Sequence, residues 1–176
     1  MRMLPVACLA LGLAACTETG TPTASMPTPG APGTSVTSDP IRDAVFDANE
    51  FFARPQAGQP ARAARAIAEI EYLAEVMPSD PRYQTSGARG LTELQVARRE
   101  ARTALGIPRN AASADVVRGL RDASAALQAN NRQAAEAALP RNVFTLGPAQ
   151  TIQRLSQPPR VPSARGALTG LAAPGR

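Results

Sequence analysis

The spacing of apolar residues constrains the fold of this chain more than any other feature, because between residues 41 and 156 it follows the period of an α-helix. In four segments apolar side chains recur at i, i+4, i+7 and i+11 or nearly so, which places them on one helix face. No alternating run of β-branched and aromatic residues lasts four residues, as a strand would require. The pattern predicts one all-α domain over 41–156.

Start and stop signals divide this region into five or six helices. Proline at a first helical position and asparagine in a tight turn mark several of the ends. Gly106 is expected to take the left-handed conformation after a helix, with Ile107 folding back onto the last turn. The expected helices cover residues 41–54, 60–77, 91–105, 112–129, 132–139 and 148–156, and residues 78–90 are expected to form a loop.

Alanine is abundant in these helices; it favours helix and lets two backbones approach closely. Because each alanine buries little area, the larger apolar residues must fill the core. Ile70 and Leu120 are expected in that core, and Phe46 and Phe51 widen the apolar face of the first helix. The predicted fold class is therefore a small, alanine-rich helical bundle with one modest core.

The segments on either side of this domain differ from it in composition. Residues 17–40 are almost entirely Thr, Pro, Gly, Ser and Ala, which cannot bury enough apolar surface to become ordered, so a linker is expected. Its 24 residues would reach roughly 70 Å if fully extended. The tail over 157–176 holds Arg160, Arg165 and Arg176 but no acid, and it is expected to be disordered. The alternative is a peptide that docks on a partner or on acidic envelope polymer.

The first residues have the composition of an export signal. Arg2 gives a positive end, and Met3–Ala15 is an apolar run of thirteen residues, shorter than the roughly 20 that span a membrane. Leu13-Ala14-Ala15-Cys16 follows, and it resembles the lipobox of bacterial envelope lipoproteins. The resemblance implies that residues 1–15 are a lipoprotein signal peptide and that Cys16 becomes the first mature residue. It also implies a diacylglyceryl group on the Cys16 thiol and an acyl chain, such as palmitate, on its amine.

The same resemblance implies a location. In lipoproteins of Gram-negative bacteria, aspartate after the lipidated cysteine favours the inner membrane, and Thr17 stands there instead. The protein is therefore expected to be anchored in the outer membrane, facing the periplasm. The chain has two cysteines, Cys8 and Cys16, so cleavage and lipidation would leave neither a free thiol nor a disulfide.

All nineteen basic residues are arginines, against fourteen acidic residues. Arg98, Arg99 and Arg102 form the densest cluster, and Arg98 and Arg102 share a helix face. This cluster is expected to be a solvated face; the alternative is a patch that binds phosphate or peptidoglycan carboxylate, because the guanidinium fork fits both. Arg65 and Glu69 are expected to form an exposed pair. Nucleic acid is not an expected partner, since few aromatic side chains can stack on bases.

The residue inventory withholds most catalytic chemistry. Without histidine or lysine the chain lacks the common general base, the Ser–His–Asp triad and the amine of Schiff-base enzymes. Carboxylate chemistry remains, and Glu69, Glu71 and Glu75 are the nearest candidates. Glu71 and Glu75 share a helix face, but each is expected to be a solvated charge. No enzymatic activity, cofactor or metal is therefore expected.

These features favour a non-enzymatic helical adaptor of the cell envelope, with another envelope protein as its partner. An alternative function is binding of peptidoglycan or lipid phosphate through Arg98, Arg99 and Arg102. A more distant alternative is a carboxylate-based glycan hydrolase that uses Glu71 or Glu75. The only covalent group expected is the lipid on Cys16, which attaches the protein to the membrane.

Overall fold

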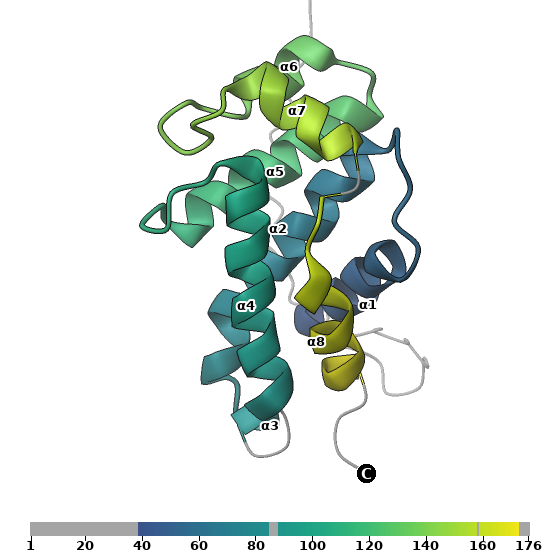
Figure 1. Ribbon diagram of the computed structural model, residues 1–176, viewed down its shortest axis with the longest axis vertical. Coiled ribbons are helices and arrows are strands. Elements are labelled where there is room, and N and C mark those ends of the chain that lie inside the picture. The colour runs from purple at the N-terminus through teal and green to yellow at the C-terminus, as the bar shows by residue number, and fades with distance from the viewer. Residues whose placement is uncertain (1–38, 85–87, 158, 173–176) are drawn as a thin grey trace, which may run out of the picture. The chain divides into compact units, whose positions relative to one another are not determined.

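Eight α-helices and one short 3₁₀ helix form the part of the chain that the computed structural model describes, residues 39–84, 88–157 and 159–172 (Figure 1). No strand occurs in these residues, so the prediction of an all-α fold is confirmed. Six of the helices correspond to the expected ones, and α3 and α8 are additional. The elements are α1 (Pro40–Ala53), α2 (Pro60–Val76), η1 (Met77–Ser79), α3 (Pro81–Gln84), α4 (Ala88–Leu105), α5 (Ser113–Gln128), α6 (Arg132–Ala137), α7 (Pro148–Ser156) and α8 (Pro162–Ala172).

The central helix is α2, because α1, α4, α5 and α7 all pack against it. Every residue from 66 to 71 is buried, so α2 has no solvated face along this stretch. Burial on all sides requires small side chains, and the alanines of α2 let its neighbours approach closely. Ile70 of α2 and Leu120 of α5 have no exposed surface, which confirms both as core residues.

The helix ends that the sequence marks have the expected geometry. Gly106 has φ of 66°, and the Ile107 amide donates to the Arg102 carbonyl at 2.8 Å, the bond that closes a left-handed helix end. Asn130 has φ of 54°, and the Asn131 amide likewise donates to the Ala126 carbonyl at 2.8 Å. These local signals fix where α4 and α5 stop.

The expectation of a disordered tail is wrong for residues 162–172, which form α8. This helix lies alongside α4 and also contacts α1 (Figure 1). Its buried face consists of Ala164, Ala167, Leu168 and Leu171, at i, i+3, i+4 and i+7. The helical domain therefore extends beyond the predicted boundary at residue 156.

The glycines that suggested disorder instead allow α8 to approach α4. A Cβ atom on Gly170 would lie 3.9 Å from the Cα atom of Gly90 in α4, and one on Gly90 would lie 3.0 Å from the Leu171 side chain. Such close approach favours residues without a side chain. Glycine in α8 thus reflects helix packing and does not indicate disorder.

Two smaller expectations are also wrong. The loop predicted over 78–90 contains most of η1, all of α3 and the first turn of α4. Pro78 is the second residue of η1, Pro81 is the first residue of α3, and the Asp80 carboxylate accepts the Arg82 amide at 2.9 Å. Phe46 is 69% exposed rather than part of the core. It lies outside the face of α1 that α2 and α8 cover.

The lipobox, Cys16 and residues 17–38 of the predicted linker lie outside the described residues, as does Arg176. The last two residues of the predicted linker belong to the domain instead, because Asp39 caps α1 and Pro40 is its first residue. Among the helices that the structure does describe, none combines the length and the apolar character needed to cross a membrane.

Candidate functional site

The central helix carries two buried acidic residues, Glu69 and Glu71. Both were expected to be solvated charges, and that expectation is wrong. Each is buried because an arginine from a neighbouring helix reaches it: Arg121 of α5 pairs with Glu69, and Arg102 of α4 pairs with Glu71. Buried charges require such partners.

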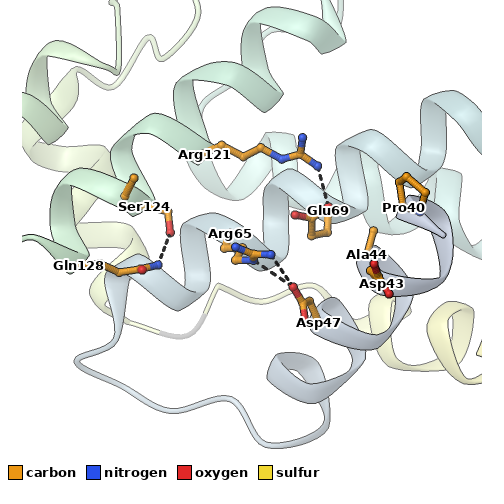
Figure 2. A pocket seen from close by; sticks show the side chains of 10 residues that line it. Pro40, Asp43, Ala44, Asp47, Arg65, Glu69, Arg121, Ser124 and Gln128 are labelled. Atoms are coloured by element: carbon orange, nitrogen blue, oxygen red, sulfur yellow. Dashed lines mark hydrogen bonds and ion pairs between the residues drawn. The ribbon is translucent and has the colours of Figure 1, made fainter. Parts of the chain in front are cut away.

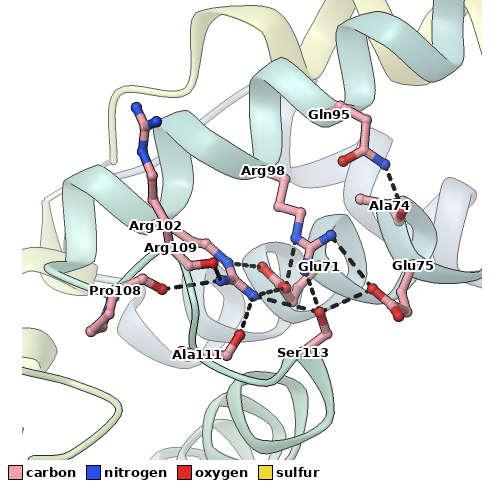
Figure 3. Close-up of polar contacts among 10 residues, drawn as sticks. All are labelled: Glu71, Ala74, Glu75, Gln95, Arg98, Arg102, Pro108, Arg109, Ala111 and Ser113. Atoms are coloured by element: carbon pink, nitrogen blue, oxygen red, sulfur yellow. Dashed lines mark hydrogen bonds and ion pairs between the residues drawn. The ribbon is translucent and has the colours of Figure 1, made fainter.

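Glu71 lies at the centre of a hydrogen-bonded network between α2, α4 and the connection from α4 to α5 (Figure 3). Its carboxylate accepts the Arg98 Nε–H at 2.8 Å and the Arg102 Nε–H at 3.0 Å. A terminal nitrogen of Arg102 donates to the same carboxylate. Both carboxylate oxygens of Glu71 are thus bound to arginine.

Arg102 also holds the connection between α4 and α5. Its terminal nitrogens donate to the backbone carbonyls of Pro108 at 3.0 Å, Arg109 at 2.8 Å and Ala111 at 3.0 Å. With the two bonds to Glu71, all five N–H groups of the guanidinium have acceptors. Arg102 therefore fastens this connection to the central helix.

The predicted patch of Arg98, Arg99 and Arg102 is consequently not one surface. Arg98 and Arg102 do share a helix face, but that face turns toward α2, and the Arg102 side chain is only 5% exposed. Arg99 is exposed and makes no contact with Glu71 in the described residues. An external phosphate or carboxylate cannot reach Arg102, because its donors are already occupied.

The predicted pair of carboxylates, Glu71 and Glu75, does converge on one arginine. Arg98 contacts Glu71 at 2.8 Å and Glu75 at 3.5 Å, and Glu75 also accepts a hydrogen bond from the Ser113 hydroxyl. The Glu71 side chain is only 2% exposed, whereas that of Glu75 is 59% exposed. A glycan could therefore contact Glu75 but not Glu71, and the two do not flank an open cleft.

Glu69 lies in a separate polar cleft of about 420 Å³ between α1, α2 and α5 (Figure 2). Arg121 binds Glu69 at 2.9 Å and also stacks over the Tyr72 ring, 5.3 Å from its centroid. The predicted pair of Arg65 with Glu69 is wrong, because Arg65 instead binds Asp47 of α1 at 2.7 Å. Four of the five charged residues that line this cleft thus form ion pairs with one another, and Asp43 is the fifth.

A different surface leaves its arginines unpaired, and we call it the arginine groove. It has a volume of about 600 Å³ and is formed by α4, α7 and the segment that precedes α8. No described carboxylate forms an ion pair with any of its four arginines. Its lining residues are Val96, Arg99, Glu100, Thr103, Ala104, Arg109, Arg154, Gln157, Pro159 and Arg160.

The single carboxylate in the groove, Glu100, is engaged elsewhere. It accepts the amide and the hydroxyl of Ser163, both at 3.0 Å, and so caps the first turn of α8. The groove therefore presents four guanidinium groups whose charge Glu100 only partly offsets. An arrangement of this kind can bind carboxylate or phosphate groups.

Of the four arginines in the groove, only Arg99 belongs to the arginine cluster that the sequence predicts. Arg109 is ten positions from Arg99, but Arg154 and Arg160 are 55 and 61 positions away, and the packing of α7 and α8 against α4 brings them to the groove. For Arg160 the sequence offers one signal, because residues 157–176 contain arginines and no acidic residue. No spacing rule connects these four positions.

The fold and this surface define a small all-α domain with an exposed cationic groove and buried ion pairs around its central helix. No known protein family matches the chain, and neither curated proteins nor solved structures provide a match.

Proposed function

We propose that this protein is a lipid-anchored, non-enzymatic interaction module of the bacterial cell envelope. Cys16 would attach it to the outer membrane, the Thr- and Pro-rich linker would give it reach into the periplasm, and the helical domain would bind another envelope protein. The lipobox-like sequence at 13–16 supports the attachment, and the composition of 17–38 supports the linker.

The arginine groove is the observation that carries this proposal. It is the place where the described surface offers several unpaired charges of one sign together with aliphatic side chains, which suits recognition of another molecule. By contrast, the carboxylates Glu69 and Glu71 are buried and bound to arginines. The surface therefore favours binding over carboxylate catalysis.

A second candidate is binding of peptidoglycan or lipid phosphate. The same groove favours it, since guanidinium groups bind carboxylate and phosphate with similar geometry. The arginines involved would be Arg99, Arg109, Arg154 and Arg160, and Arg98 and Arg102 would not take part. The glycan hydrolase is not favoured, because Glu71 is inaccessible.

Site-specific photocrosslinking in intact cells tests the proposal. A photoreactive residue at Gln157, which lines the groove, should capture one reproducible envelope protein. The same photoreactive residue placed at Gln133, which is exposed on α6 and lies outside the groove, should not capture that envelope protein.

Two outcomes would contradict the adaptor. Salt-sensitive pelleting of the protein with purified cell wall, without any protein crosslink, would establish the second candidate instead. Cleavage of glycan strands by the purified protein, lost in Glu75→Gln, would show that the protein is an enzyme.

A further inference from the structure

The chemistry of the arginine groove indicates what kind of partner it fits. Arg99 lies on α4, Arg109 follows that helix, Arg154 lies on α7 and Arg160 precedes α8. All four are exposed, so their charges surround the groove from several elements instead of forming one helical stripe. A ligand in the groove would meet cations on more than one side.

Between these charges the groove is aliphatic. Val96, Ala104 and Pro159 are partly buried and line it together with Thr103. A bare phosphate would use only the arginines, whereas a peptide with acidic and apolar side chains would use both the charges and the aliphatic surface. This combination of lining residues favours a peptide.

The backbone beneath the groove is held in place. Arg154 donates to the Ala104 carbonyl at 3.2 Å, which connects α7 to the end of α4. The Arg109 carbonyl accepts a bond from the buried Arg102 at 2.8 Å, and Glu100 fixes the start of α8 through Ser163. The positions from which the four arginines extend are therefore preorganised, which reduces the entropy lost on binding.

The groove also lies away from the point where the linker joins the domain. Asp39, the first described residue, lines a pocket with Leu171 and Ala172 at the end of α8, whereas Arg160 precedes the start of that helix. The 11 residues of α8 separate the two places by roughly 16 Å along its axis. The groove and the first described residue of the domain therefore lie near opposite ends of α8.

We infer that the arginine groove binds an acidic peptide segment of a partner protein, with its carboxylates on the guanidinium groups and its apolar side chains on the aliphatic surface. The inference rests on the proposed function, because it names the chemistry of the adaptor's partner.

The test uses the purified full-length chain in non-ionic detergent and a short fluorescent peptide of glutamate and leucine. The groove variant replaces Arg99, Arg109, Arg154 and Arg160 by Gln. A matched control replaces four exposed arginines outside the groove by Gln and so changes the net charge equally; these are Arg62, Arg89, Arg118 and Arg132. Circular dichroism verifies that both variants keep their helices.

Affinity for the peptide is expected to fall at least about tenfold in the groove variant and to stay within about twofold in the control. An equal loss in both variants would mean that net charge alone attracts the peptide, and would overturn the inference. So would binding to phosphatidylglycerol vesicles or purified cell wall with no binding to the peptide.

A second variant avoids removing any arginine. Thr103→Glu places a carboxylate on the exposed side of α4 within the groove, where it should occupy the guanidinium groups and weaken peptide binding at least about tenfold. Unchanged affinity in this variant would also overturn the inference. Neither result depends on lipidation of Cys16. If an envelope protein is captured in cells through another surface, the adaptor proposal holds and the inference about the arginine groove is wrong.

Discussion

Arg102 directs all five of its N–H groups to acceptors within the protein, two of them to Glu71 and three to backbone carbonyls between α4 and α5. Removing Arg102 takes away the donors to three backbone carbonyls and leaves Arg98 as the remaining ion-pair partner of the buried Glu71 carboxylate. A substitution at Arg102 should therefore destabilise the domain strongly.

We therefore expect Arg102→Leu to lower the free energy of unfolding by about 3–5 kcal/mol. Arg102→Lys should recover only part of this loss, because an ammonium group keeps the charge but lacks the planar fork. Urea unfolding followed by circular dichroism measures both effects. Arg118→Leu is the matched control, since Arg118 is 69% exposed and pairs only with Asp115 three residues away; a comparable loss there would contradict the special role of Arg102.

Asp39 and Asp80 link the start of α1 to α3 through Arg82. Hydrogen bonds from the Arg82 side chain hold the pKa of both carboxyls below their ordinary value of 3.8. A lowered pKa in the folded state stabilises the fold above the unfolded value, and this contribution is lost as the pH falls through the folded pKa. The link between α1 and α3 should therefore open in acid, below about pH 4.

Arg82→Gln should raise the pKa of Asp39 and Asp80 toward 3.8. Titration of the carboxyl carbons by nuclear magnetic resonance measures both values directly. Arg62→Gln serves as the control, because Arg62 pairs with Glu50 and with neither aspartate. Unchanged pKa values in Arg82→Gln would show that Arg82 does not stabilise the ionised carboxyls.

Among the helices, α8 is the one whose contribution to the core is least apparent from its amino-acid composition. It packs on α4 and α1 with Leu168 fully buried, and its first turn is capped by Glu100. Although α8 is the last helix described, it completes the core formed by helices much earlier in the chain. The groove also depends on it, since Arg160 directly precedes it.

Leu168→Ala should lower the free energy of unfolding by about 2–5 kcal/mol, because it leaves a cavity between α8 and its neighbours. Thr169→Ala, at the next position and exposed, should change stability by less than about 0.5 kcal/mol. Chemical denaturation of the two variants gives the comparison. Equal stability of both would mean that α8 does not contribute to the core in solution.

For the whole molecule, the proposed function joins two properties that are physically independent. The helical domain is stabilised by its own core and ion pairs, whereas membrane attachment would come from the lipid on Cys16. Two or more acyl chains would make that attachment stable. Loss of the lipid should therefore change the location of the protein in the cell and leave the fold of the helical domain unchanged.

We expect Cys16→Ser to abolish lipid attachment and to release the protein from the membrane fraction. Mass spectrometry of the wild-type protein should find the acyl mass on Cys16 with residues 1–15 removed. Circular dichroism should give the same helix content for both forms. Membrane fractionation that is unchanged in Cys16→Ser would rule out the lipoprotein proposal.

The helices themselves were largely predictable from the sequence, because helix formation depends on residues a few positions apart. The apolar period located α1, α2, α4, α5, α6 and α7 to within a few residues, and Gly106 and Asn130 marked two ends correctly. The exceptions are α3 and α8, where proline and glycine were interpreted as signs of loop or disorder. In α8 those glycines serve close packing against α4.

The candidate site depended on tertiary structure. Glu71 and Arg102 are 31 positions apart, and Glu100 and Ser163 are 63 apart, so no local pattern could pair them. Charge alone suggested that Arg98, Arg99 and Arg102 act together, but packing against α2 buries Arg102 and leaves Arg99 to a different group of arginines. The sequence by itself determined most of the helices and, through the absence of histidine and lysine, which side-chain chemistries the chain does not carry. The packing of helices distant in sequence decided which charges are buried and which remain free to bind, because an ion pair requires two side chains to meet in space.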